Sequence, residues 1–479
     1  MEVLTNQEAA VSRPRPFATL AVVSFALFMV TLDNLVVTTA LPSIRVDLGA
    51  SLDALEWTVN AYTLTYAVFL LTGAALGDRF GRRRMFLAGL SLFTLSSAAA
   101  ALAPGAAALI AARAVQGVGA AMVTPLTLTL LSDAFPADRR GAAIGIWSGV
   151  SGLGVALGPL VGGAVVDGIS WHWIFWLNVP VGLAVLPFAA RVLTEGRGPN
   201  RTLDVPGVAL GSLGLTGIVY GLVDGNAAGW GSPAIVGAFV SGAALLVAFV
   251  AWEARTPQPV LPLRFFRSRA FAATNGVSLV MYFGIFGSIF LLAQVFQTAQ
   301  GNTALESGLR TLPWTGMPMI VAPLAGLLSD RIGSRPLMVA GLVAQSVAIG
   351  WLAAILDVGT PYVEQLPALV LGGVGMALVF APAANAVVSA VRPAEVGQAS
   401  GATNTIREIG GVMGIAVLAA VFSANGSYGS PQAFMDGVSP ALWVGAGTLS
   451  VGAALAMLVP GRPAKAQATA APELAAAAA

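Results

Sequence analysis

Three charged residues lie inside long apolar stretches of the sequence, where a charge is costly: Asp33, Arg113 and Glu408. Burial disfavours the ionised form of a carboxyl group, whereas a nearby arginine favours it. A carboxyl group subject to both effects can load a proton in one state of a protein and release it in another. We predict that Asp33 carries a proton tuned by Arg113, and that Glu408 binds a proton or a cationic substrate. For each residue the alternative is an ion pair that only fixes packing.

The composition identifies the elements that must hold these charges. Hydrophobic residues make up 57% of the 479-residue chain and charged residues 10%, which is too few charges for a soluble surface or a disordered chain. The chain has no cysteine and one histidine, so we expect no disulfide framework and no metal site or cofactor. A net charge of +2 does not indicate nucleic-acid binding. These values predict an all-α polytopic membrane protein.

Charges, prolines and glycines divide the sequence into fourteen apolar segments that can cross a bilayer of ~30 Å. A turn signal at Pro104-Gly105 divides the longest apolar stretch into two of them. The predicted spans begin near residues 17, 56, 85, 107, 140, 171, 204, 232, 268, 304, 336, 363, 397 and 438.

Positive charges set the orientation, because Lys and Arg are retained on the cytoplasmic side. With both termini inside, this side receives all 24 basic residues except Arg45, Arg113, Arg310 and Arg407. An even number of spans preserves this bias along the chain. We therefore expect a multi-pass protein of the cell membrane, with a cytoplasmic N-terminal segment 1–16 and a disordered cytoplasmic tail 461–479.

This orientation places two of the buried charges at one depth. At ~1.5 Å per helical residue, Asp33 lies roughly 13 Å from Pro42 at the outer end of the first span. Arg113 lies about 12 Å from Pro104-Gly105 at the outer end of the fourth span. Both charges are therefore expected in the outer half of the membrane.

The sequence also repeats internally. Gly141-Ala-Ala-Ile-Gly145 corresponds to Gly397-Gln-Ala-Ser-Gly401, and Asp78-Arg79 corresponds to Asp330-Arg331 in the same order along the chain. Compositional coincidence is the alternative reading. The repeat pairs spans 2–6 with spans 10–14, as in transporters built from parallel repeats. It predicts two six-helix bundles, 17–195 and 268–460, with 204–254 as an inserted two-helix hairpin.

The loop after the second span reads Gly77-Asp78-Arg79-Phe80-Gly81-Arg82-Arg83-Arg84. Its glycines permit a tight turn, and its aspartate can pair locally or face another helix end. The loop resembles the signature loop of the major facilitator superfamily, which implies the major facilitator fold and a cytoplasmic latch between the halves. The alternative is a loop that only sets topology. The predicted latch residues are Gly77, Asp78, Arg79, Gly81, Arg83, Asp330 and Arg331.

Further motifs resemble the fourteen-helix drug/proton antiporters of this superfamily. Leu32-Asp33 in the first span resembles the family's span-1 motif, and Arg113 its span-4 motif, whose Arg is linked to proton transfer. Small residues in the fifth span let helices approach closely, and its proline permits a kink. This run resembles the antiporter motif of exporters. Its residues are Gly154, Gly158, Pro159 and Gly162. Trp171-His172-Trp173 also matches the family, which usually has Arg where this chain has His172.

Together these features predict a proton-coupled antiporter, not an enzyme, that exports amphipathic cationic or aromatic molecules such as drugs or antibiotics. Its partners would be the small-molecule substrate, protons and the lipid bilayer, and we expect a monomer. A nucleotide-binding Gly-x-x-x-x-Gly-Lys loop does not occur, which argues against ATP as the energy source. The alternative is an uptake symporter of the same fold for a polar nutrient. Candidate substrate-binding residues are Glu408, Phe283, Phe286, Phe290 and Trp314.

Overall fold

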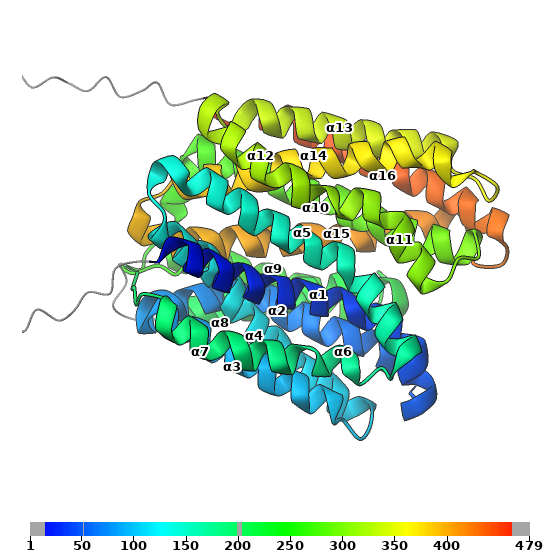
Figure 1. Cartoon of the computed structure of the whole chain (residues 1–479), viewed down its shortest axis with the longest axis horizontal. Coiled ribbons are helices and arrows are strands. Elements are labelled where there is room, and N and C mark those ends of the chain that lie inside the picture. The colour runs from blue at the N-terminus through cyan, green and yellow to red at the C-terminus, as the bar shows by residue number, and fades with distance from the viewer. Residues whose placement is uncertain (1–14, 51, 199–203, 462–479) are drawn as a thin grey trace, which may run out of the picture.

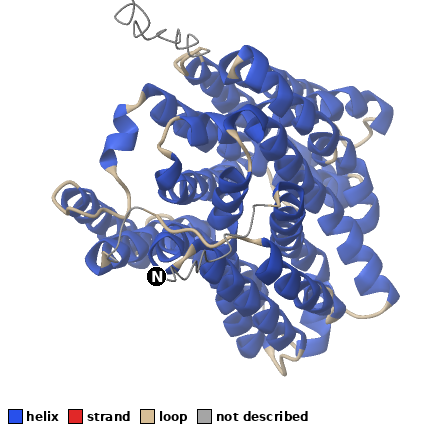
Figure 2. Cartoon of the chain, turned by 60° about the vertical axis from the view of Figure 1, so that its left-hand side comes forward, coloured by secondary structure: helices blue, strands red, loops and turns tan. Residues whose placement is uncertain are grey.

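The computed structural model describes residues 15–50, 52–198 and 204–461. In this part of the chain, 14 helical spans are long and apolar enough to cross a membrane, which confirms the predicted number. Helices satisfy their own backbone hydrogen bonds, as an apolar environment requires. Figure 2 shows the described residues as helices joined by short connections. The predicted segments 1–16 and 461–479 lie almost wholly outside the described residues.

The first half of the chain forms six spans around the predicted turns. The turn at Pro104-Gly105 separates two of its helices as expected, and Gly81, at φ 115°, makes the sharp turn after the second span. The sixth span is interrupted by a short break near Leu177. The helices are α1 (Pro16–Leu48), α2 (Leu52–Phe80), α3 (Arg82–Ala101), α4 (Ala106–Ala134), α5 (Ala137–Gly168), α6 (Trp173–Trp176) and α7 (Asn178–Val192).

A two-helix hairpin of α8 (Val205–Ala228) and α9 (Pro233–Glu253) follows, and then six more spans. The last span begins at Pro431 rather than near 438, because Ser430 caps it by accepting a hydrogen bond from the backbone N–H of Ala433. The remaining elements are η1 (Leu263–Arg267), α10 (Arg269–Gln294), η2 (Val295–Ala299), α11 (Ala304–Thr315), α12 (Met317–Ile332), α13 (Ser334–Ile355), α14 (Tyr362–Ser389), η3 (Pro393–Glu395), α15 (Val396–Asn425) and α16 (Pro431–Ala456).

The two halves repeat each other's packing. In the first half α1 packs on α5, α2 and α3 pack on α4, and α3 packs on α7. In the second half α10 packs on α15, α12 and α13 pack on α14, and α13 packs on α16. Gly333, at φ 88°, makes after α12 the turn that Gly81 makes after α2. The halves lie side by side in Figure 1.

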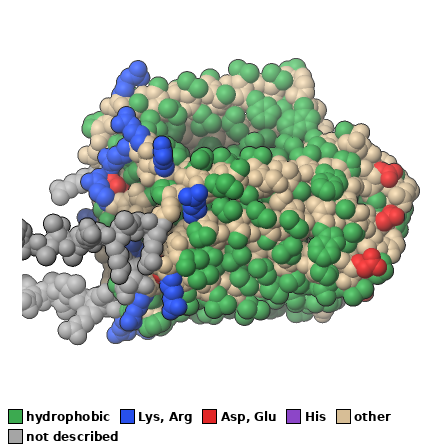
Figure 3. Space-filling view, turned by 90° about the horizontal axis from the view of Figure 1, so that it is seen from above, with side chains coloured by type: hydrophobic (Ala, Val, Ile, Leu, Met, Phe, Trp, Pro, Cys, Tyr) green, Lys and Arg blue, Asp and Glu red, His purple; other side chains and the backbone are tan. Residues whose placement is uncertain are grey.

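Two seams join the halves. At one seam α5 packs along α11 and α12, and at the other α2 packs on α15. The hairpin covers the second seam, since α8 contacts both α2 and α15, while α9 packs chiefly on α8. On the face seen in Figure 3, basic side chains gather at the end where α1 begins, and acidic side chains at the opposite end.

Candidate functional site

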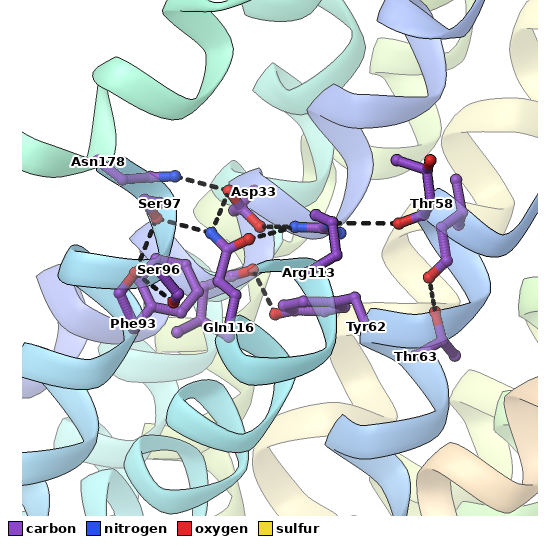
Figure 4. Close-up of polar contacts among 12 residues, drawn as sticks. Asp33, Thr58, Tyr62, Thr63, Phe93, Ser96, Ser97, Arg113, Gln116 and Asn178 are labelled. Atoms are coloured by element: carbon purple, nitrogen blue, oxygen red, sulfur yellow. Dashed lines mark hydrogen bonds and ion pairs between the residues drawn. The ribbon is translucent and has the colours of Figure 1, made fainter. Parts of the chain in front are cut away.

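A buried ion pair joins α1 and α4. Nη1 of Arg113 lies 2.6 Å from Oδ2 of Asp33, and both side chains have no exposed surface. The Nε2 of Gln116 and the Nδ2 of Asn178 donate to Oδ1 of Asp33 over 2.9 and 2.6 Å (Figure 4). Gln116 also donates to the hydroxyl of Ser97. A buried charge needs such partners, and here α4 and α7 supply them to the carboxylate while Ser97 of α3 holds Gln116.

The arginine of this pair also faces an aromatic ring. The guanidinium of Arg113 lies 4.2 Å above the ring of Tyr62, and its Nε donates to the backbone oxygen of Thr58. Its Nη2 has no hydrogen-bond partner among the described residues. The sequence predicts that Asp33 and Arg113 lie at similar depth and that Arg113 tunes Asp33. The structure places them in direct contact and adds Gln116 and Asn178, to which we had assigned no role.

Between the two halves lies a cavity, which we call the central cavity. From the first half it is lined by Tyr62 and Tyr66, whose rings stack at 5.8 Å. From the second half it is lined by Phe286 and by Tyr282, stacked at 5.0 Å, and by charged residues of α15. Tyr62 therefore touches both the ion pair and the cavity. Further lining residues include Thr31, Asn34, Thr124, Trp147, Ser148, Ser151, Phe380, Asn404, Arg407 and Glu408.

Of the predicted substrate-binding residues, Glu408 and Phe286 line the central cavity. Phe283, Phe290 and Trp314 do not. Phe283 packs against the core of the second half, Phe290 is 40% exposed, and Trp314 is buried against Gly372 in that core. Aromatic residues on an apolar helix look alike in sequence whichever face they occupy.

The tyrosines that line the cavity were missed in the sequence. Tyr62 and Tyr66 are four residues apart on α2 and therefore share one helix face, which was the available signal. Tyr282 was equally available, four residues before Phe286 on α10.

At the other end of α2, Arg82 rather than Arg79 or Arg83 connects the two halves. Its Nε lies 3.0 Å from Asp78 and its Nη1 lies 2.8 Å from Asp133, while its Nη2 donates to the backbone oxygen of Ala394 in η3. Arg79 lies over the ring of Phe80, and Arg83 bonds within the first half. We had not included Arg82 among the latch residues.

The acidic residues of the predicted latch make reciprocal contacts. A Cβ atom added to Gly397, at the start of α15, would lie 2.5 Å from Oδ1 of Asp78. One added to Gly141, near the start of α5, would lie 2.1 Å from Oδ1 of Asp330. Each half thus places the acidic end of one helix against a glycine of the other half. The remaining latch residues lie beside these contacts: Gly77 packs on Leu126, Gly81 makes the turn, and Arg331 is exposed.

The glycines of the predicted antiporter motif pack α5 against α1. Cβ atoms at Gly154, Gly158 and Gly162 would lie 3.0, 2.7 and 2.2 Å from atoms of α1. The contacted segment of α1, Phe28 to Thr39, contains Asp33. The helix that carries the buried carboxylate is therefore packed closely against α5. The side chain of Pro159 lies outside the described residues.

Near the end of α1, His172 stacks on Trp171, and its Nε2 lies 3.9 Å from the carboxylate of Asp47. The same carboxylate accepts a hydrogen bond from the indole of Trp171. The position that is usually Arg in the family therefore lies beside an acid in this chain.

Comparison with known proteins agrees with this architecture. Residues 23–415 match the model of the Major Facilitator Superfamily. The tetracenomycin C resistance and export protein of Streptomyces glaucescens is 36% identical over 416 residues, 86% of this chain and 77% of that protein. The cephamycin export protein CmcT of Amycolatopsis lactamdurans is 37% identical over 455 residues, 93% of this chain and 92% of that protein.

A solved structure shares the fold at low sequence identity. The proton:xylose symporter XylE superposes with a TM-score of 0.66 at 15% identity, over 93% of this chain and 96% of that chain. The all-helical fold, the 14 spans and the export proteins among its relatives agree with the resemblance found in the sequence. This chain is a membrane transporter, not an enzyme, and it belongs to the major facilitator superfamily.

Proposed function

We propose that this protein is a proton-coupled antiporter that exports amphipathic aromatic molecules, antibiotics among them, across the cell membrane. The observation that carries the proposal is the position of Tyr62, which contacts the guanidinium of Arg113 and also lines the central cavity. The ring of Tyr62 therefore separates the Asp33–Arg113 pair from a substrate in the cavity, and it can transmit a change in the charge of Asp33. The export functions named for two relatives support the direction of transport.

Coupling follows from the contacts of the ion pair. When a proton binds Asp33, Arg113 loses the charge of its partner but keeps the ring of Tyr62 and the backbone oxygen of Thr58. The loss of this attraction allows the guanidinium to move away from Asp33, and Tyr62, which is in contact with it, moves as well. A substrate that binds better to one position of Tyr62 changes the proton affinity of Asp33 by the same factor, because coupling between two sites is reciprocal.

We further propose that the basic end of the molecule faces the cytoplasm, with both termini there, and that one chain is the transporting unit. The central cavity supports the proposal of a single-chain transporter, because both halves of one chain line it. In this state the contacts of Asp78, Arg82 and Asp330 join the halves at the basic end. Alternating access then requires these contacts to separate when the cavity opens to the cytoplasm.

Everted membrane vesicles with an acid interior test the direction of exchange. Addition of tetracenomycin C to the medium should release protons from the lumen, which a pH-sensitive acridine dye reports as recovered fluorescence. Vesicles without the protein control for passive leakage. Proton release only when the compound is loaded inside the vesicles would indicate an uptake symporter and contradict the proposal.

A further inference from the structure

The central cavity carries two adjacent charges of opposite sign. Arg407 and Glu408 on α15 both line it. Among the described residues neither side chain makes an ion pair or a hydrogen bond, and Nε of Arg407 is buried without a partner. Arg113 and Arg82, in contrast, each have carboxylate partners. Arg407 is buried and Glu408 half-buried, and unpaired charges shielded from water are costly, so a ligand that pairs with both would relieve this cost.

The two charges face different parts of the same space. Successive residues of a helix point ~100° apart, so Arg407 and Glu408 do not oppose one another and can hold separate groups of one ligand. The guanidinium of Arg407 lies 5.6 Å from the ring centre of Tyr282. The stacked rings of Tyr62 and Tyr66 line the cavity from the other half. These tyrosines and both charges line one cavity, so a flat aromatic ligand with two charged groups fits the chemistry of its walls.

We propose that the central cavity selects amphoteric aromatic molecules. Arg407 would bind an anionic group such as a carboxylate or phenolate, and Glu408 a cationic amine. This inference rests on the proposed export function and narrows its substrate class. It also revises the prediction that the site binds cations, because that prediction was based on Glu408 without Arg407. A ligand with only a positive charge leaves Arg407 unpaired and is repelled by it.

Tetramethylrhodamine and its methyl ester provide a matched pair of probes. Both have the same cationic ring system, but the free acid carries a carboxylate that the ester lacks. Purified full-length protein in lipid nanodiscs should bind the free acid about tenfold more tightly than the ester, measured by fluorescence polarisation. Equal binding, tighter binding of the ester, or binding of neither dye would overturn the inference.

Variants of Arg407 and Glu408 test which residue causes the preference for the free acid. Arg407→Gln should remove the preference for the free acid, whereas Arg407→Lys, which keeps the charge, should retain a large part of it. Glu408→Gln should weaken both dyes by similar factors, because both are cationic. Thermal unfolding of each variant checks that the fold is intact. An unchanged ratio of affinities in a folded Arg407→Gln protein would overturn the inference.

The result is separable from that of the vesicle experiment. If tetracenomycin C drives proton release but the dye affinities show no charge preference, only the substrate class is wrong. If the dye affinities follow the prediction but no compound drives proton release, the site binds as inferred and the proposed antiport is wrong.

Discussion

The two halves of the molecule share their packing but not their buried polar groups. In the first half Asp33, Arg113 and Gln116 form a connected network at the core. In the second half Leu369 occupies the position that the repeat assigns to the counterpart of Arg113, and it is buried in a hydrophobic cluster with Ile285. The fold therefore does not need the charges. They are additions to one half, which is what a specialised proton site would require.

The second half carries a different specialisation. Its charged residues Arg407 and Glu408 lie on α15, the helix that corresponds to α5, and they face the cavity rather than the core. The glycine packing is common to both halves: Gly154 and Gly158 bring α5 onto α1, and Gly410 and Gly414 bring α15 onto α10. Under the proposed function, the proton belongs to one half, the substrate charges to the other, and the glycines to the shared scaffold.

The largest effect is expected for Asp33→Asn. Asparagine keeps the shape of the side chain but cannot exchange a proton, so pH-driven efflux should fall to background. Expression should be retained, since a static structural pair would instead fail by misfolding. The measurement is initial transport into everted vesicles, normalised to the amount of protein in the membrane. Full pH-driven efflux by this variant would falsify the assignment.

The matched control lies in the other half. Gln345 is also fully buried, and within the described part of the chain its Nε2 donates to a single acceptor, the backbone oxygen of Gly341. Gln345→Met, which conserves the volume, should change pH-driven transport by less than about twofold. Downhill substrate exchange, which needs no proton, should survive in Asp33→Asn. Equal losses in both variants would remove the difference between the halves.

The next effect concerns the shared scaffold. Gly158→Leu should push α5 from α1, and Gly414→Leu should push α15 from α10, because a Cβ atom added there would lie 2.7 or 2.1 Å from the facing helix. Transport by each variant should fall by about tenfold or more. Gly447, on the exposed side of α16 with no atom within 4 Å of an added Cβ, gives the control Gly447→Leu. Normal efflux by Gly158→Leu alone would show that the halves do not share this requirement.

A smaller effect is expected at the latch, where Arg82→Gln can be compared with Arg79→Gln. Arg82 is 3% exposed and connects Asp78 and Asp133 with the second half, so its loss should destabilise the protein by about 3–5 kcal/mol and slow transport. Arg79 lies over Phe80 and makes no ion pair or hydrogen bond with the described residues, so its loss should cost less than about 0.5 kcal/mol. Thermal unfolding in nanodiscs measures both. Equal shifts would show that the loop acts through its total charge.

The number of spans could be predicted because hydropathy and segment length determine it. The repeat could be predicted because both halves need glycines at corresponding positions for close helix packing. The depth of Asp33 and Arg113 could be predicted from helix geometry, but not their contact, which depends on how α1 and α4 are rotated. On α10, Phe286 lines the cavity whereas Phe290, one helical turn further along, does not, and this depends on how far the cavity extends along the helix. Arg82 was missed because four arginines within one loop are equivalent until the fold places one of them against η3.

The smallest effects are expected in the hairpin, whose helix α8 contacts both halves. The hydroxyl of Ser212 lies 3.1 Å from that of Thr72 in the first half, and the Nδ2 of Asn226 donates over 3.2 Å to the backbone oxygen of Ala416 in the second half. Each bond is part-buried, so Thr72→Val or Asn226→Ala should cost about 1 kcal/mol of stability. Neither variant should change transport by more than about twofold.

Variants at these two contacts also test which half of the protein the hairpin moves with during transport. If α8 moves with the first half, the bond from Asn226 must break in every cycle, and Asn226→Ala should leave transport unchanged or slightly faster. Thr72→Val would then act on stability alone. Initial rates and unfolding temperatures of the two variants, measured on the same preparations, separate the two effects. A tenfold loss of transport in Asn226→Ala would show instead that the hairpin is fixed to the second half or is itself a moving part.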